Sequence, residues 1–129
     1  MAGTEEPNPG RRARIEVVVG EADTARAMGS GDVDVLASPR VVALAEEAAV
    51  SALGDCLPEG KTSVGVWVEL EHNAPSHVGS TVVVEAVLLG VHGRRLEFSV
   101  SLTEGGTEVA HVRHRRIVAS RSRFEPAGN

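Results

Sequence analysis

The sequence predicts an α+β domain in which an antiparallel sheet of about five strands wraps around one long helix. Three observations carry this prediction: one strong helix pattern, several runs that alternate between apolar and polar residues, and glycine-containing turns between the last runs. Short turns join antiparallel neighbours, and a helix that is apolar on most sides must be covered by a sheet.

The N-terminal part of the chain predicts one strand before the helix. Residues 1–13 are polar and contain Pro7 and Pro9, so we expect a flexible segment. The β-branched residues of 14–19 predict the first strand. The stretch 21–35 is rich in Gly, Ala and Asp without clear periodicity, which is typical of a loop or a weak helical turn.

The strongest local signal is a helix over Pro39–Leu53. Ser38 is the expected N-cap, Pro39 suits the first turn, and Gly54 is a typical stop. Almost all other residues of this run are Val, Ala or Leu, so the helix should be buried on most of its circumference. Glu46 breaks the pattern, because it lies on the stripe opposite the polar face.

Four strands should follow the helix. The first of these strands is predicted by a pattern with a period of two. One row of the pattern should face the helix and consists of Val64, Val66, Val68, Leu70 and His72. The other strand-like runs are 81–89, 96–103 and 108–118, separated by hairpin residues at 90–93 and 104–106. This order of elements is the topology of the hotdog fold, with the domain over 14–124 and a flexible tail at 125–129.

Composition excludes several classes of protein. The chain has 129 residues, 18 Asp plus Glu against 13 Lys plus Arg, and three aromatic residues, so a nucleic-acid binder is not expected. It lacks an apolar run long enough to span a membrane and an apolar leader segment. A single cysteine, Cys56, suits a reducing cytoplasm.

Three residues are candidates for chemistry. A carboxylate on a buried stripe, as expected for Glu46, must be paired, hydrogen-bonded or protonated, and it is either a general base or the partner of an arginine. His72 is either its proton-transfer partner or a structural histidine at a strand end. Ser38 is either a simple cap or a group that helps the helix N-terminus stabilise negative charge.

Other polar groups carry weaker signals. Neither His72 with His77 nor His111 with His114 has the spacing of a metal site, so no metal is expected. The arginine-rich stretch 113–123 suits a small phosphorylated ligand, or it is a solvated strand end.

Several short motifs together resemble the fluoroacetyl-CoA-specific thioesterase-like family of hotdog proteins. They are Leu36-Ala37-Ser38-Pro39, Glu46-Glu47-Ala48-Ala49, Glu69 to Pro75, Gly93-Arg94-Arg95-Leu96 and Arg115-Arg116-Ile117-Val118. The resemblance runs from about Arg14 to Phe124, and both the spacing of eight from Ser38 to Glu46 and that of 26 from Glu46 to His72 match the family.

The resemblance implies an acyl-CoA thioesterase that hydrolyses a small acyl-CoA to free acid and CoA. It implies a homodimer with active sites near the subunit interface and no cofactor, because CoA is part of the substrate. By position it implies catalytic roles for Ser38, Glu46 and His72, and substrate contacts for Gly65 and Arg115. The absence of aromatic residues from 21–35 predicts an acyl pocket lined by small side chains.

The sequence is compatible with two chemical roles for Glu46 and with alternative functions. Glu46 would either attack the thioester carbonyl or activate a water, while His72 moves the proton and Ser38 orients the pair. The main alternative is a hotdog protein that binds acyl-CoA or another small ligand without turnover. A hydratase or an RNA-associated module using 113–123 fits the sequence less well.

Overall fold

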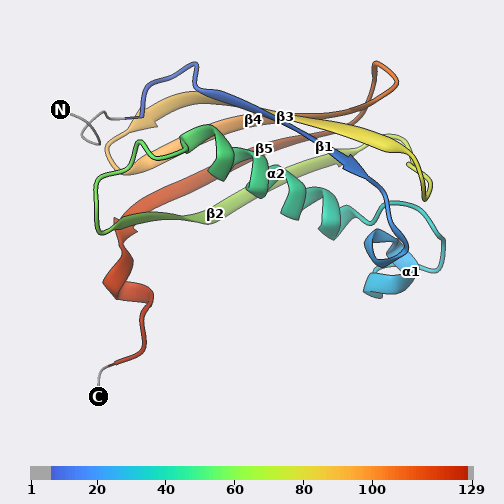
Figure 1. Ribbon diagram of the computed structural model, residues 1–129, viewed down its shortest axis with the longest axis horizontal. Helices are drawn as coiled ribbons and strands as arrows, with labels where there is room; N and C mark the ends of the chain where they lie inside the picture. The colour runs from blue at the N-terminus through green and yellow to red at the C-terminus, as the bar shows by residue number, and fades with distance from the viewer. Residues whose placement is uncertain (1–6, 128–129) are drawn as a thin grey trace.

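The computed structural model describes residues 7–127 and shows a curved five-stranded sheet with one long helix packed on one face (Figure 1). In chain order the elements are β1 (Arg12–Val18), the 3₁₀ helix η1 (Glu21–Asp23), α1 (Ala25–Met28), α2 (Ser38–Leu53), β2 (Lys61–His72), β3 (Thr81–His92), β4 (Arg95–Glu104), β5 (Thr107–Ser120) and the 3₁₀ helix η2 (Arg121–Phe124). The strand order is β1-β3-β4-β5-β2, and all neighbours are antiparallel. This architecture confirms the predicted hotdog fold. Residues 1–6 and 128–129, which fall in the expected terminal segments, lie outside the described residues.

The long helix α2 has the predicted extent but a different start. Its N-cap residue is Ala37, and no side chain caps it, so the prediction that Ser38 is the N-cap is wrong. Ser38 is the first helical residue, which leaves its hydroxyl available to another partner. The helix stops at Gly54, whose φ of 57° is left-handed and favours glycine.

One apolar core joins α2 to the sheet. The helix contributes Val41, Leu44, Ala45, Ala48, Ala49, Ala52 and Leu53. The sheet contributes alternate residues of β3, β4 and β5, with Phe98 as the largest fully buried side chain. Small Ala and Val side chains on the helix let its backbone lie close to the sheet. None of the helices in residues 7–127 is long and apolar enough to cross a membrane.

Leu44→Ala is expected to lower the free energy of unfolding by about 2–5 kcal/mol. Leu44 is fully buried between α2 and the sheet, so the shorter side chain leaves a cavity. Urea denaturation of the variant measures the loss. The matched control, Leu89→Ala, removes the same atoms from a side chain that is 49% exposed and should cost less than about 1 kcal/mol. Equal losses would contradict the assigned core.

Strand β2 departs from the predicted alternation. A bulge interrupts its pairing with β5, because Gly65 lies opposite Arg116 and Trp67 lies opposite Arg115, with Val66 as the extra residue. Opposite residues share a face of the sheet, so the row that faces the helix is Ser63, Gly65, Val68, Leu70 and His72. The prediction that Val64 and Val66 belong to this row is therefore wrong, and the bulge turns Gly65 toward the helix.

The remaining elements differ from prediction mainly at their ends. The stretch 21–35 forms η1, α1 and a loop, as expected for a weakly helical segment. Strand β1 begins at Arg12, and its last predicted residue, Val19, is buried. Strands β3 and β4 extend further than expected, so their turn shrinks to Gly93 and Arg94, while Gly90 lies at a second bulge.

Candidate active site

Ser38 and His72 form a hydrogen-bonded pair at the N-terminus of α2. The Ser38 Oγ lies 2.8 Å from the His72 Nδ1, so the first residue of the helix contacts the last residue of β2. The other ring nitrogen of His72, Nε2, is buried and has no hydrogen-bond partner among the described residues. An unpaired buried nitrogen is costly in a folded protein, so this position suits a group supplied by a ligand or by another chain.

The environment of His72 keeps its imidazole neutral. Burial lowers the pKa of His72 below its usual 6.5. A recess of about 280 Å³ lies beside the pair and is lined by Ala25, Ser30, Val35, Leu36, Ala37, Ser38, His72, Asn73, Ala74 and Pro75. Apart from His72 and Asn73, these side chains are small or aliphatic. The recess therefore suits a small group that is largely apolar.

Glu46 lies in a second polar cluster further along α2. Its Oε2 is 3.6 Å from the Arg116 Nη1 and 3.8 Å from the His114 Nε2, both on β5. The side chain of Glu46 is 40% exposed, whereas those of His114 and Arg116 are 0% and 8% exposed. The expectation that Glu46 is buried therefore does not hold in the single chain, and the structure shows the contact of the alternative interpretation, in which Glu46 pairs with an arginine of a strand.

The two basic partners of Glu46 are held in a fixed arrangement. Arg116 donates from Nε to the Ser63 hydroxyl at 2.8 Å and from Nη2 to the Ser63 carbonyl at 3.0 Å. Its Nη1 donates to the His114 Nε2 at 3.1 Å, so this nitrogen carries no proton. The other nitrogen, Nδ1, then donates to the Trp67 carbonyl at 2.9 Å. A neutral His114 thus fixes the guanidinium that faces Glu46.

The pKa values of the two basic groups agree with this arrangement. Burial lowers the pKa of His114 below 6.5, against an opposing effect of its hydrogen bond to Trp67. Burial also lowers the pKa of Arg116, and Glu46 acts against that shift. An arginine stays protonated in proteins, so Arg116 is a buried cation whose partner is the carboxylate of Glu46.

Gly65 provides the space that Glu46 occupies. A Cβ at this position would collide with the Glu46 Oε2, and it would lie 2.9 Å from the His114 Cε1 and 3.5 Å from the Arg116 Nη1. Only a residue without a side chain lets the strand lie this close to the carboxylate. The bulge at Val66 is what points this glycine at the cluster.

The two clusters are separated within one chain. Ser38 and Glu46 are eight residues apart on α2, a rise of about 12 Å along the helix axis. On β2, Gly65 lies seven residues before His72, a separation of roughly 20 Å along the strand. The described polar contacts of Glu46 are with β5, not with Ser38 or His72. The three expected catalytic residues therefore do not meet inside one chain.

The structure places Arg116, and not Arg115, beside Glu46. Arg115 lies on the other face of β5, where its guanidinium stacks 4.3 Å from the centre of the Trp67 ring and pairs with Glu97 at 3.1 Å. Sequence reasoning missed His114 and Arg116 because it treated 113–123 as one basic stretch. The period of two in β5 was the available signal, since both residues share a face with the buried Val112.

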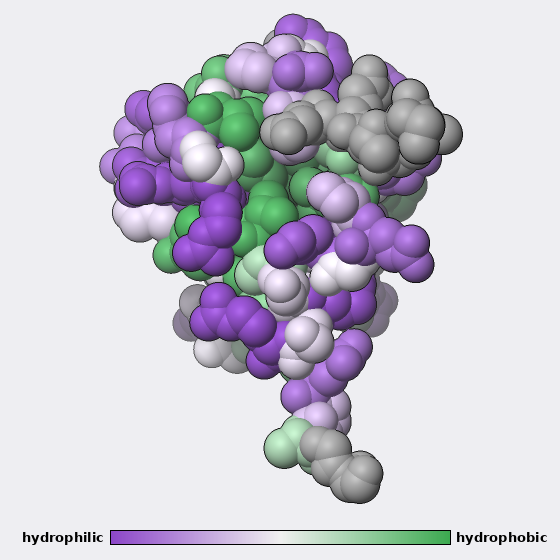
Figure 2. Space-filling view, turned by 90° about the vertical axis from the view of Figure 1, so that its left-hand side faces the viewer, coloured by the Kyte–Doolittle hydropathy of each residue, from purple (hydrophilic) through white to green (hydrophobic). Residues whose placement is uncertain are grey.

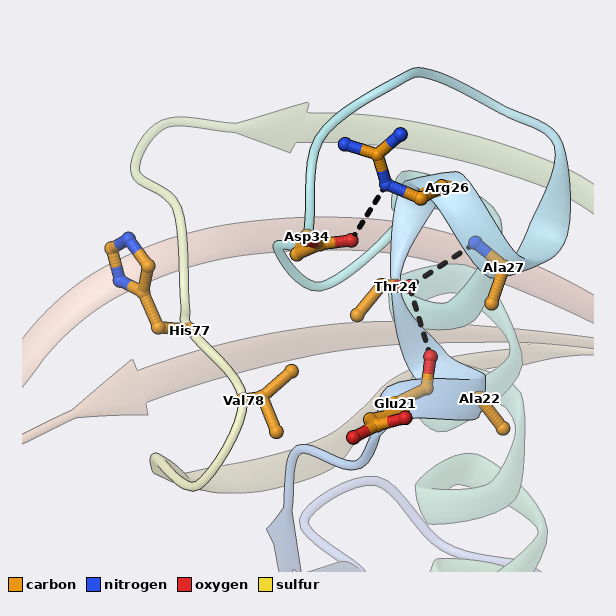
Figure 3. A pocket seen from close by; sticks show the side chains of 8 residues that line it. All are labelled: Glu21, Ala22, Thr24, Arg26, Ala27, Asp34, His77 and Val78. Carbon is orange, nitrogen blue, oxygen red and sulfur yellow. Dashed lines mark hydrogen bonds and ion pairs between the residues drawn. The ribbon is translucent and has the colours of Figure 1, made fainter.

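A larger, open pocket of about 800 Å³ lies beyond the short helices (Figure 3). Its walls come from η1, α1 and the loop before β3, and the bridge between Val35 and His77 runs between it and the recess at His72. Two of its polar side chains, Arg26 and Asp34, pair with each other at 2.9 Å. Within residues 7–127 no three His, Cys, Asp or Glu side chains converge as a metal site would need.

Acidification below pH 6.5 is expected to lower the free energy of unfolding, because burial lowers the pKa of His72 and of His114 below 6.5 in the folded chain. The unfolded chain then binds protons first as the pH falls, which favours unfolding by up to about 1.4 kcal/mol per pH unit for each histidine. Urea denaturation between about pH 7.5 and about pH 5.5 measures this slope. His114→Gln keeps an acceptor for Arg116 and should reduce the slope; an unchanged slope would argue against a titrating His114.

The sequence model of the family described as fluoroacetyl-CoA-specific thioesterase matches residues 19–122. The chain belongs to this family. The match includes α2 and strands β2 to β5, so both clusters lie within the part of the chain that matches the family. The family is one of thioester hydrolases, which agrees with the resemblance seen in the sequence motifs.

Individual proteins and solved structures are also similar to this chain. A fluoroacetyl-CoA thioesterase of Streptantibioticus cattleyicolor is 36% identical over 91 residues, which cover 70% of this chain and 66% of that protein. The solved fluoroacetyl-CoA thioesterase FlK superimposes with a TM-score of 0.85 at 31% identity, over 93% of each chain. A hot-dog-like protein from Thermanaerovibrio acidaminovorans gives a TM-score of 0.83 at 25% identity, over 98% of this chain and 99% of that one.

Proposed function

We propose that the protein hydrolyses a small acyl-CoA thioester to the free acid and CoA. The observation that carries this proposal is the carboxylate of Glu46, held beside Gly65 by the buried cation Arg116. A solved variant of FlK in complex with fluoroacetate and CoA, 31% identical to this chain and with a TM-score of 0.85, supports the substrate class. The recess beside Ser38 and His72 favours short acyl groups.

In the proposed reaction Glu46 acts on the thioester carbonyl. It either attacks the carbonyl carbon, which gives an acyl-enzyme anhydride that water then hydrolyses, or removes a proton from a water that attacks directly. In both routes the carbon–sulfur bond breaks and the CoA thiolate leaves. Arg116 keeps the carboxylate oriented, and Gly65 leaves room for the thioester beside it.

His72 and Ser38 supply the proton transfer. A neutral imidazole donates or accepts a proton at Nε2, which is the nitrogen left without a partner. Ser38 fixes the ring through its 2.8 Å contact with Nδ1. The backbone N–H groups at the start of α2 lie next to Ser38 and favour the negative charge that develops on the carbonyl oxygen. The reaction needs no metal and no cofactor apart from the CoA of the substrate.

We propose that the working form is a homodimer joined along β2. This strand is at the edge of the sheet, since it pairs only with β5. Its middle is exposed and apolar, with Val66, Trp67 and Val68 at 54%, 37% and 38% exposure. A long, apolar, unpaired edge is a site for pairing with another chain, and a two-fold axis is the usual symmetry.

Such a dimer would complete the active site. Antiparallel pairing of two β2 strands about Glu69, with Val66 as the extra residue of the bulge, sets Gly65 opposite His72 of the partner subunit, because both residues are then the third paired position from Glu69. Both also lie on the face that carries the helices. Glu46, Gly65 and Arg116 of one protomer would then act with the partner's Ser38 and the partner's His72.

The composition supports two further parts of the proposal. The single cysteine suits a reducing compartment, so we place the protein in the cytoplasm. Acidic residues outnumber basic ones, 18 to 13, which does not favour nucleic acid as a partner.

Thiol release from a panel of acyl-CoA thioesters tests the proposed function. The purified chain should release CoA from short acyl thioesters such as acetyl-CoA, measured with a thiol-reactive dye, and more slowly from long-chain ones. The alternative is a protein that binds acyl-CoA without turnover. Tight binding of the same thioesters without any thiol release would favour this alternative and overturn the proposal.

A further inference from the structure

A third pocket lies at the end of the molecule where α2 stops and η2 begins. It has a volume of about 390 Å³ and is lined by Val50, Leu53, Gly54, Asp55, Leu57, Pro58, Glu59, Gly60, Lys61, Thr62, Ser63 and Arg121. Figure 2 looks onto this end of the molecule and shows an apolar centre bordered by hydrophilic side chains. The proposed reaction steps leave the cations of this pocket without a role.

The pocket is continuous with the cluster around Glu46. Ser63 belongs to both, because it lines the pocket and accepts two hydrogen bonds from Arg116. Val50 lies one helical turn after Glu46 on the same side of α2. Lys61 precedes Gly65 by four residues, a distance of about 13 Å along β2. This span is comparable with the pantetheine arm that separates a CoA thioester from its phosphate groups.

The charges of this acidic chain are unevenly distributed between its two ends. The end with the pocket, made of residues 54–61, 92–95 and 119–127, has five Lys or Arg and three Asp or Glu. The opposite end, made of residues 20–37, 73–80 and 104–108, has one Arg and six Asp or Glu. Within one protomer, a ligand with several phosphate groups is therefore favoured at the first end over the second.

The cations at the pocket are available to a ligand. Lys61 and Arg121 are exposed, and neither forms an ion pair within residues 7–127. Each has only a long hydrogen bond, from the Lys61 Nζ to the Ser120 Oγ at 3.3 Å and from the Arg121 Nη2 to the Lys61 carbonyl at 3.5 Å. The acids of the lining, Asp55 and Glu59, come instead from the turn after α2.

We infer that this pocket binds the phosphate groups of the coenzyme A moiety, with Lys61 and Arg121 as their cationic ligands. The inference rests on the proposed function, because it assumes that the thioester lies at Glu46. The arm of the substrate then runs along the exposed side of α2, past Val50, and its phosphates emerge at the basic end of the molecule. The arginine-rich stretch that ends β5 thereby acquires a role in substrate recognition through Arg121.

Two substrates with the same acyl group separate this role from catalysis. Acetyl-CoA carries the phosphates, whereas S-acetyl-N-acetylcysteamine carries the thioester on a short arm without them. The double variant Lys61→Gln/Arg121→Gln should raise the KM for acetyl-CoA roughly tenfold, as expected for the loss of two exposed ionic contacts. The KM for the short thioester should be unchanged. The matched control Arg14→Gln removes an exposed arginine from β1 and should change neither KM.

A second readout does not depend on turnover. Lys61 is the only lysine of the chain, so an amine-reactive acylating reagent followed by peptide mass analysis reports on this one side chain besides the N-terminus. Free CoA should slow the modification of Lys61 in the wild-type protein, and pantetheine, which lacks the nucleotide phosphates, should not. Added salt should weaken the protection.

The outcomes distinguish the inference from the proposed function. An unchanged KM for acetyl-CoA in the double variant, an equal rise for both substrates, or equal protection of Lys61 by CoA and pantetheine would each overturn the phosphate site. If neither thioester is hydrolysed, the proposed function fails, and protection of Lys61 by CoA still decides whether the phosphates bind here.

Discussion

Glu46→Gln and His72→Ala are each expected to lower the rate of thiol release by about a hundredfold to ten-thousandfold. Glutamine keeps the shape of the side chain facing Arg116 but is neither a base nor a nucleophile. Alanine at position 72 removes the ring that contacts Ser38 and with it the nitrogen that moves the proton. Both substitutions lie outside the apolar core, so the variants should remain folded dimers.

A mixture of the two inactive variants should regain activity if the site is shared between protomers. In a mixed dimer one site receives both substitutions, and the other receives an intact Glu46 from one chain and an intact His72 from its partner. After subunit exchange in an equimolar mixture, about a quarter of all sites are intact, so about a quarter of the wild-type rate should return. Mild denaturation and refolding of the mixture, followed by the thiol-release assay, measures this.

The controls for this experiment come from the same helix. Glu47→Gln changes the neighbouring carboxylate, which is exposed on α2, and should retain full activity. Full activity of Glu46→Gln would remove that residue from the mechanism. Inactive variants that fail to complement each other, although they exchange subunits, would show that each site is built from one chain.

Gly65→Ala is expected to lower kcat by about a hundredfold or more, because a shift of about 1 Å in a reacting group costs that much. The new methyl group would overlap the Glu46 Oε2 and press on His114, so the carboxylate must leave its position beside Arg116. Steady-state kinetics with acetyl-CoA measures the loss. Circular dichroism and urea denaturation establish whether the variant is folded.

A second glycine provides the matched control. Gly20 has an extended backbone with φ of −104°, and a Cβ there would meet the Asp23 carboxylate at an ordinary 3.5 Å. Gly20→Ala should therefore leave kcat unchanged. If a folded Gly65→Ala variant kept wild-type kcat, Gly65 would not be needed for the placement of Glu46, and the proposed role of the bulge would be wrong.

The predicted helices, strands and turns agree with the structure wherever one periodicity of apolar residues continues along the chain. The apolar run of α2 and the stop at Gly54 follow from residues that are neighbours in the sequence, and so do the hairpins at Gly93 and at Gly105. The prediction was wrong where a single extra residue changes the register. The bulge at Val66 moves Gly65 to the inner face and Val64 to the outer one. A glycine inside a strand was the available hint.

The prediction from the sequence was limited in the same way for the arginine beside Glu46. Arg115 and Arg116 are adjacent, so alternation places them on opposite faces of β5, and a short motif does not say which one faces the helix. The structure decides, because β5 pairs with β2 and β4 in a register that turns His114 and Arg116 inward. Their hydrogen bonds to Ser63 and Trp67 join segments about 50 residues apart in the sequence.

The sequence by itself determined the fold class, the long helix and the residue types of the candidate chemistry, since these depend on periodicity and on short motifs. Only the tertiary structure decided how those residues group: Ser38 with His72, and Glu46 with Gly65, His114 and Arg116. The physical reason is distance. Eight residues of helix rise about 12 Å, so Ser38 and Glu46 do not share one site in a single chain, and the dimer that we propose would bring the two halves together.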